Sequence, residues 1–153
     1  MNLKINKETA KKLHAEVPSW FQKLLEDNFG IETFKKRDYT DIKTFEEACN
    51  EVGVDPLRVT SPDDTIDEAA YKKLKIIVAA INNGWKPDWT NSNQYKYFPW
   101  FSLSSGSGLS VLVYACHYSS SAVGSRLCYE SSDKCKYAME QFKSIYEDFF
   151  IIK

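Results

Sequence analysis

The feature that most constrains the fold is a change in the spacing of apolar residues near residue 95. Before it, apolar residues recur every three or four positions, which is the spacing of an amphipathic helix. From 95 to 130 apolar and polar residues alternate, which is typical of strands with one buried face. After 130 the helical spacing returns. Helices followed by strands and a final helix predict an α+β fold.

Capping and stop signals divide the helical parts. Thr44 with Glu47 and Thr65 with Glu68 are capping boxes, and glycines stand where helices should stop. The long central helix begins at 61–62 or at the Thr65 box and ends near residue 83. We expect helices at 6–17, 19–30, 44–53, about 61–83 and 131–150.

The alternating segment predicts a three-stranded antiparallel β-meander over about residues 95–130. Its strands are expected at 95–103, 109–118 and 125–130, separated by two serine-rich loops. Proline cannot donate a hydrogen bond to a neighbouring strand. Pro99 therefore indicates that the first strand lies at a sheet edge or carries a bulge.

Length and composition indicate a globular protein. The chain has 153 residues, 43% of them hydrophobic and 27% charged, which suits one domain over 1–153. The formal net charge of −1 provides no overall attraction to nucleic acid or to an anionic membrane. The start of the chain has no apolar signal-peptide core and no segment is apolar enough to span a membrane. We therefore expect a cytoplasmic protein whose four cysteines are free thiols.

Register arithmetic assigns the strand residues to two faces. A first hairpin centred near Gly106 places Phe101 opposite Val111, Pro99 opposite Val113 and Tyr97 opposite Ala115. The first sheet face is then almost wholly apolar and aromatic, and seats the long helix and the C-terminal helix. The second sheet face mixes aromatic with polar residues: Lys96, Phe98, Trp100, Ser102, Ser110, Leu112, Tyr114, Cys116, Tyr118, Arg126, Cys128 and Glu130.

Three interpretations of the second sheet face stay open. The N-terminal helices cover it, because their apolar faces must pack somewhere. Alternatively, part of it is open and binds a partner. In the third interpretation the register is wrong by one residue, which would exchange the two faces.

The second sheet face supplies the candidate binding residues. Aromatic residues and arginine with few charges are typical of the centre of a protein–protein interface, so a protein partner or self-association is the leading hypothesis. Weak binding of single-stranded nucleic acid on the same aromatics is an alternative, although residues 85–130 hold only three basic residues. A small-molecule or nucleotide pocket between sheet and helices is the third. The candidate partner-binding residues are Lys96, Phe98, Trp100, Tyr114, Tyr118, Arg126 and Trp89.

Catalytic and metal-binding patterns are not apparent in the sequence. The chain has two histidines, His14 and His117, and His117 points to the opposite strand face from its neighbour Cys116. The cysteines lack the close pairing of a zinc site, and no phosphate-binding or dinucleotide-binding glycine pattern occurs. The acidic pairs Glu46/Glu47 and Asp63/Asp64 lie at expected helix starts, where they favour capping. We expect no enzymatic activity, no catalytic residue, no metal and no cofactor.

Three segments resemble a known family. They are "TFEEACNEVGVDP", "NNGWKPDWTNSNQYKYFPWF" and "VGSRLCYESSDKCKYAMEQFKSIYEDF". They are similar to a family of small proteins from phages and integrated mobile elements of gut anaerobic bacteria, and the resemblance covers roughly residues 42–150. The segment 1–41 is more variable. No activity is established for that family, so the resemblance implies a phage or mobile-element accessory protein and transfers no catalytic residue.

Overall fold

The computed structural model describes residues 5–35, 37–104, 108–118, 120–121 and 123–152. For Glu8, 103–104 and 108–114 the description is confined to the backbone. Where one domain was expected, the chain forms two compact units, Met1–Arg37 and Asp38–Lys153. The division falls close to the end of the segment 1–41 that the sequence analysis sets apart.

The first unit consists of two helices and a 3-10 turn. Helix α1 covers Lys7–His14, α2 covers Ser19–Phe29, and the turn covers Ile31–Thr33. The two helices expected here are confirmed, although both are shorter than the sequence suggested. His14 Nε2 lies 2.8 Å from Glu26 Oε1, and the imidazole stacks on Phe34 with ring centroids 4.3 Å apart. This pair ties α1 to α2 and to the turn.

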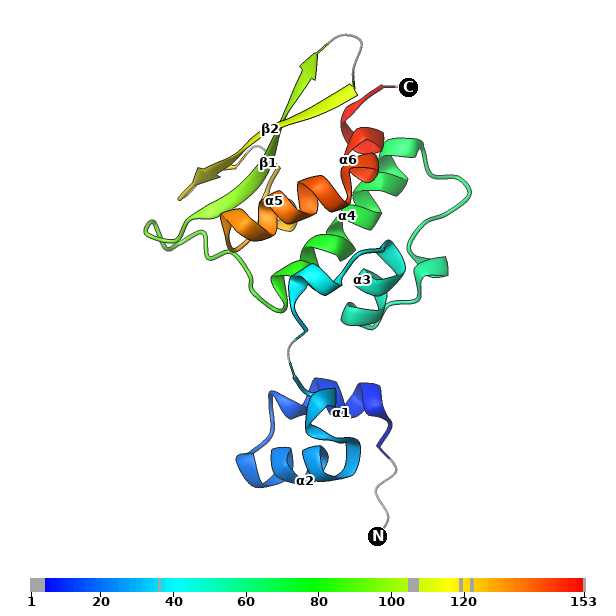
Figure 1. The fold of residues 1–153 in the computed structure, drawn as a ribbon, viewed down its shortest axis with the longest axis vertical. Helices are drawn as coiled ribbons and strands as arrows, with labels where there is room; N and C mark the ends of the chain where they lie inside the picture. Colours follow the sequence, from blue (N-terminus) through cyan, green and yellow to red (C-terminus); the bar gives the residue numbers. More distant parts are fainter. Residues whose placement is uncertain (1–4, 36, 105–107, 119, 122, 153) are drawn as a thin grey trace. The chain divides into compact units, whose positions relative to one another are not determined.

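The second unit contains the α+β fold. Helix α4 lies at its centre, α3 and α6 pack along α4, and α5 packs on both strands of the sheet (Figure 1). Its core is a single cluster that includes Leu74, Ile77 and Ile81 of α4. The elements are α3 (Phe45–Val52), α4 (Ile66–Asn82), β1 (Lys96–Ser104), β2 (Gly108–His117), α5 (Ser132–Gln141) and α6 (Lys143–Phe150), with 3-10 helices at Tyr39–Asp41, Pro56–Arg58 and Ser125–Leu127.

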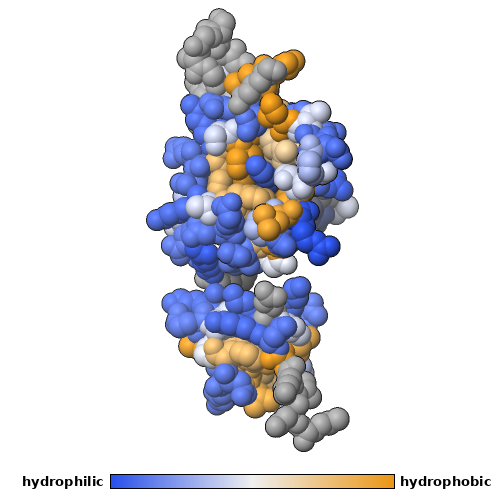
Figure 2. Space-filling model, turned by 90° about the vertical axis from the view of Figure 1, so that its right-hand side faces the viewer, coloured by the Kyte–Doolittle hydropathy of each residue, from blue (hydrophilic) through white to orange (hydrophobic). Residues whose placement is uncertain are grey.

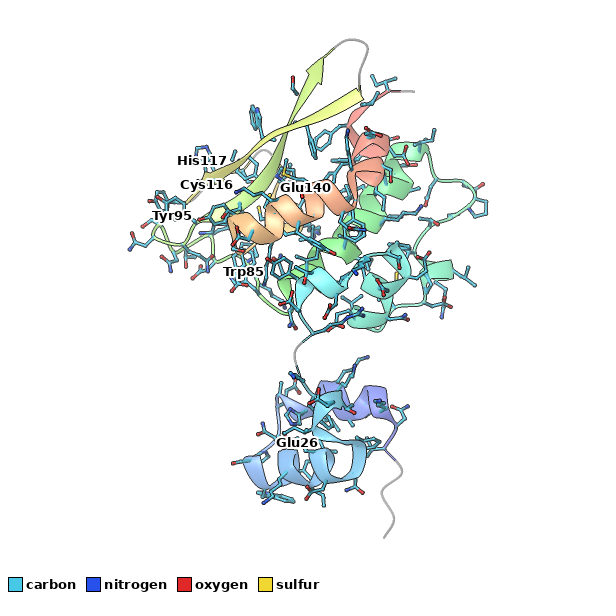
Figure 3. All side chains as sticks on the ribbon, in the orientation of Figure 1. Glu26, Trp85, Tyr95, Cys116, His117 and Glu140 are labelled. Atoms are coloured by element: carbon cyan, nitrogen blue, oxygen red, sulfur yellow. The ribbon has the colours of Figure 1, made fainter. Side chains whose placement is uncertain are left out.

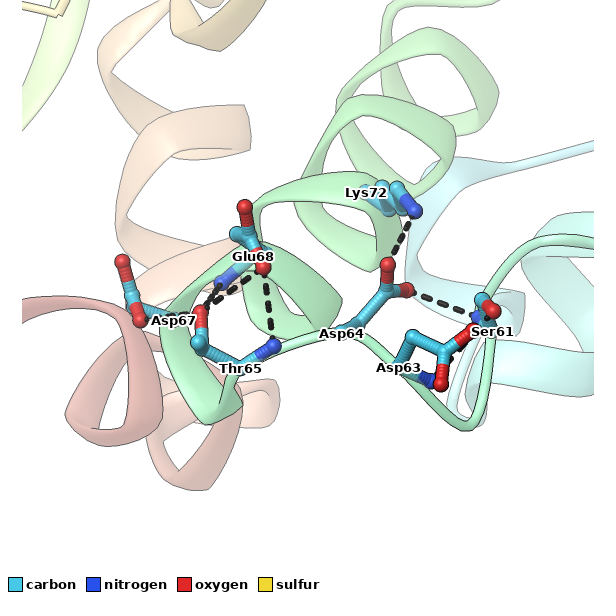
Figure 4. A network of polar contacts seen from close by, with 7 residues as sticks. All are labelled: Ser61, Asp63, Asp64, Thr65, Asp67, Glu68 and Lys72. Atoms are coloured by element: carbon cyan, nitrogen blue, oxygen red, sulfur yellow. Dashed lines mark hydrogen bonds and ion pairs between the residues drawn. The ribbon is translucent and has the colours of Figure 1, made fainter.

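The acidic residues at the helix starts act as caps. Thr44 with Glu47 and Thr65 with Glu68 form complete capping boxes, in which each side chain bonds the other residue's backbone N–H. Figure 4 shows the network before α4. There Asp64 pairs with Lys72, with Oδ1 2.5 Å from Nζ, and accepts the Ser61 N–H at 2.7 Å. The hydrogen bond to Lys72, followed by that from Ser61, lowers the pKa of Asp64.

The sheet has two strands, and its register corrects the sequence prediction. Phe101 lies opposite Val111 as expected, but Pro99 lies opposite Tyr114 and Tyr97 opposite Cys116. The shift arises at a bulge, because Trp100 pairs with Val113 while Phe101 pairs with Val111, which leaves the residue between them without a partner. The sequence predicted an edge position or a bulge for the strand of Pro99; a bulge does occur nearby, but its extra residue belongs to β2 and not to the strand of Pro99. One extra residue exchanges the faces of β2 from Val113 onward.

The prediction of a third strand at 125–130 is wrong. Ser125–Leu127 forms a 3-10 helix, and only Tyr129 pairs with the sheet, through an isolated antiparallel bridge to Tyr97. This bridge lies on the edge of β1 away from β2, whereas the meander would have placed the segment beside β2. The fold class α+β is confirmed, and the three-stranded meander is replaced by a two-stranded ribbon.

The side chain of Asn82 explains why residues 128–130 leave the meander. Asn82 ends α4 and is buried. Its Nδ2 donates to the Cys128 carbonyl at 2.8 Å, and its Oδ1 accepts the Glu130 N–H at 3.1 Å. The carboxamide therefore acts as a neighbouring strand would, and holds this segment against α4 instead of β2.

The C-terminal helix expected over 131–150 is two helices. The chain breaks at Phe142, whose backbone (φ −112°, ψ 26°) is not helical. Phe142 is buried in the core. The break lets α5 pack on the sheet while α6 runs along α4, which one straight helix could not do.

Loss of the two hydrogen bonds of the Asn82 carboxamide should destabilise the second unit. Asn82→Ala leaves a buried carbonyl and a partly buried N–H without partners, so we expect the free energy of unfolding to fall by about 2–4 kcal/mol. Chemical denaturation measures it. The neighbouring Asn83→Gly variant is the control. Asn83 has φ 48°, which glycine adopts without strain, so its stability should change little. Equal losses in the two variants would contradict the role of the carboxamide.

The Asp64 pair should give a pH-dependent contribution to stability. Since folding lowers the pKa of Asp64, its contribution is present above the unfolded pKa of about 4 and is lost as pH falls through the folded value. Asp64→Asn should therefore lower the melting temperature at pH 7 and lose this effect near pH 2. Asp63→Asn is the control, since that carboxylate has no hydrogen-bond partner among the described residues. A pH-independent loss in Asp64→Asn would contradict the prediction.

Candidate interaction surface

The structure separates the candidate binding residues into buried and exposed groups. Lys96 is 0% exposed and Phe98 2%, whereas Trp100 is 51% and Tyr118 41% exposed. Arg126 is exposed and Trp89 is half-buried. The side chain of Tyr114 lies outside the described residues. Lys96 and Phe98 lie on the same strand face as Trp100, as the alternation predicted, but they are buried, whereas Trp100 is exposed.

A loop, rather than a helix, covers Lys96. Its Nζ donates to the Asn91 carbonyl at 3.0 Å and lies 5.5 Å from the centre of the Trp89 ring. The ammonium thus has a carbonyl and an aromatic face as partners, which offsets the loss of water. None of the three interpretations of the second sheet face predicted that the segment after α4 would cover Lys96.

Hydrogen bonds within residues 85–95 hold this loop in shape. Gln94 Oε1 accepts the Asp88 N–H at 2.7 Å, and Asp88 Oδ1 accepts the Thr90 N–H at 2.9 Å. The bonds from the Thr90 hydroxyl and amide lower the pKa of Asp88, and Lys96 makes a smaller contribution in the same direction. The aromatic-rich segment after α4 is therefore held in shape by its own hydrogen bonds and covers Lys96, with the Trp89 ring in contact with the ammonium group.

Phe98 is a core residue of the second sheet face. Its ring stacks with His117 at a centroid distance of 6.1 Å. His117 was assigned to the first face and Cys116 to the second, and both assignments are wrong for the register reason given above: His117 pairs with Lys96, and Cys116 pairs with Tyr97.

Tyrosines gather at the end of the sheet away from the β-hairpin turn. The hydroxyl of Tyr118 donates to that of Tyr95, and the two rings lie 4.2 Å apart between centroids. That bond, more than burial, raises the pKa of Tyr118. Figure 3 shows Tyr95, Cys116 and His117 at this end. Tyr95, with which the first strand was expected to begin, precedes β1 and is 43% exposed.

Exposed hydrophobic residues occur in both units. Figure 2 shows orange hydrophobic side chains among hydrophilic ones on one side of each unit. In the first unit the largest is Trp20, which is 71% exposed. In the second unit Trp100 and the Tyr95–Tyr118 pair are the exposed aromatics of the sheet region. They do not share one face: Trp100 lies on the second sheet face with Phe98, whereas the observed register puts Tyr95 and Tyr118 on the first face with Tyr97. The exposed part of the second sheet face around Trp100 is named the aromatic surface below.

The cysteines lie in different surroundings. Cys128 is buried, whereas Cys116, which lies opposite Tyr97, is exposed. Burial raises the pKa of Cys128, although the Ser121 hydroxyl and Lys96 oppose this effect. Among the described residues, no three His, Cys, Asp or Glu side chains are grouped so that they could hold a metal ion.

Two cavities are lined by residues other than those of the aromatic surface. One, of about 300 Å³, lies in the first unit beside His14, Glu26 and Phe34. The other, of about 490 Å³, lies between the start of α4 and the end of α6, where Ile66, Asp67 and residues 148–152 line it. The third hypothesis expected a pocket between sheet and helices, and neither cavity has that position.

Comparisons with protein-family models, with curated proteins and with solved structures found no match for this chain. In the described part of the chain, no helix combines the length and apolar character needed to cross a membrane.

Lys96 should contribute to the stability of the fold and should not act as an exposed charge. Lys96→Met keeps the length of the side chain but leaves the Asn91 carbonyl without its donor, so we expect a loss of about 1–3 kcal/mol in chemical denaturation. Lys86→Met is the control, because Lys86 is an exposed lysine of the same loop. If both variants unfold at the same denaturant concentration as the unmodified chain, Lys96 has no structural role.

Proposed function

We propose that this chain is a non-enzymatic accessory protein of a phage or mobile element, acting in the host cytoplasm, and that it binds a protein partner through the aromatic surface. The observation that carries the proposal is Trp100. It is half-exposed on the same strand face as the buried Phe98, although burial of a tryptophan would contribute substantially to stability.

The surroundings of Trp100 favour a protein over a nucleic acid. No Asp, Glu, Lys or Arg occurs between residues 97 and 125. Lys96, one of three basic residues in 85–130, is enclosed and cannot meet a phosphate. Nucleic-acid affinity usually needs several accessible cations, whereas an exposed tryptophan in an uncharged surrounding is typical of a protein-interface hot spot.

The test is a pull-down from the native host with the tagged full chain, followed by titration of each purified candidate. Trp100→Ala should keep the circular dichroism spectrum and weaken binding at least about tenfold, as expected for a hot-spot tryptophan. Trp20→Ala is the matched control. It removes another exposed tryptophan outside the aromatic surface, and should leave the dissociation constant unchanged.

Two results would contradict this proposal. If Trp100→Ala binds every candidate as tightly as the unmodified chain, the aromatic surface is not the binding site. If the eluate contains nucleic acid and its affinity falls steeply with salt, the rival hypothesis of single-strand binding replaces the protein partner.

A further inference from the structure

The direction of the backbone groups in the sheet can be derived from one bridge. Tyr97 donates its N–H to the Tyr129 carbonyl at 3.1 Å and accepts the Tyr129 N–H at 2.7 Å. Both backbone groups of Tyr97 therefore point away from β2. In an antiparallel pair, residues that bond across the ladder alternate with residues whose groups point outward. Tyr97 and Cys116 are thus a non-hydrogen-bonded pair, and the backbone groups of Cys116 point away from β1.

The same alternation applies two residues further along. Pro99 lies opposite Tyr114, and Pro99 has no N–H to donate, as a non-hydrogen-bonded position allows. The backbone N–H and C=O of Tyr114 therefore also point outward. Ala115, between them, pairs with Phe98 and directs its groups toward β1. The outer edge of β2 presents a regular row of backbone donors and acceptors.

No strand covers this edge in the described part of the chain. The sheet order is β1–β2, and the bridge at Tyr129 lies on the other side of β1. The segment that the sequence analysis expected beside β2 is held instead by Asn82. A ten-residue strand is left with one edge unpaired.

The edge lacks most of the features with which proteins prevent strand pairing. Such edges usually carry lysine, another charged residue or proline. β2 has none of these, and its sequence GLSVLVYACH is rich in residues that favour strands. The bulge next to Val113 interrupts the edge, so the regular part is 113–117. Over these five residues nothing repels a second strand.

We propose that a second copy of this chain pairs antiparallel with the 113–117 edge of β2, across a two-fold axis. Pairing about Ala115 places Tyr114 of one copy opposite Cys116 of the other. Both residues direct N–H and C=O outward, so they exchange hydrogen bonds. A second copy is favoured because an uncharged edge offers no repulsion to itself, and because two-fold pairing uses the same surface on both chains.

Pairing would also complete the sheet. A two-stranded ribbon is marginal by itself, whereas two copies form a continuous four-stranded sheet in the order β1–β2–β2–β1. This inference goes beyond the proposed function, since it concerns the backbone edge of β2 and not the aromatic surface.

Hydrogen exchange of the unmodified full chain tests the pairing directly. In reducing buffer, light scattering should give twice the chain mass, and the amides of Tyr114 and Cys116 should exchange more slowly as concentration rises. The amide of Ala115, bonded within the chain, should be protected at every concentration. A monomer at all concentrations overturns the proposal. Protection of Tyr114 and Cys116 in a monomer also overturns it, because the edge is then covered by its own chain.

Proline variants test the same edge by mass. Cys116→Pro removes only an outward N–H, so it should give a folded monomer. Cys116→Ser is the matched control and should remain a dimer, which also excludes a disulfide as the cause. Ala115→Pro removes an inward N–H and should lower the melting temperature more than Cys116→Pro. A dimer that persists in folded Cys116→Pro overturns the proposal.

Discussion

The second unit depends on the two hydrogen bonds of the Asn82 carboxamide. Asn82 ends the central helix and binds the backbone of Cys128 and Glu130 on either side of Tyr129. This places Tyr129 in the core, where its hydroxyl lies 2.7 Å from that of Tyr146, and sets its backbone against Tyr97. Burial of both phenols raises the pKa of each. The two hydrogen bonds of Asn82 thereby connect α4, through Tyr129, to β1 and α6.

The two hydrogen bonds of Asn82 also determine which parts of the sheet stay accessible. Because Asn82 holds residues 128–130 and Tyr129 bridges to β1, no described strand lies beside β2, and its outer edge is open. On the second face, the loop 85–95 encloses Lys96 but leaves Trp100 exposed. The path of the chain after α4 therefore leaves the aromatic surface exposed, and its path after β2 leaves the edge of β2 open.

Much of the fold could be predicted from the sequence because its signals are local. The capping boxes at Thr44 and Thr65 depend on residues a few positions apart. The candidate site was only partly predicted. Trp100, Tyr118 and Arg126 are exposed, but Lys96 and Phe98 are buried, and the register puts Tyr118 on the other sheet face from Trp100. An alternating pattern does not reveal which loop will cover a sheet face.

The sequence by itself determined the α+β class, the helix starts and the concentration of uncharged aromatic residues in the sheet region. These follow from hydrophobic period, capping chemistry and composition, which act over a few residues. The tertiary structure alone decided the register beyond the bulge, the break at Phe142 and the partner of residues 128–130. Each of these depends on contacts between residues distant in sequence. Asn82 and Glu130 are 48 positions apart, so no local pattern could pair them.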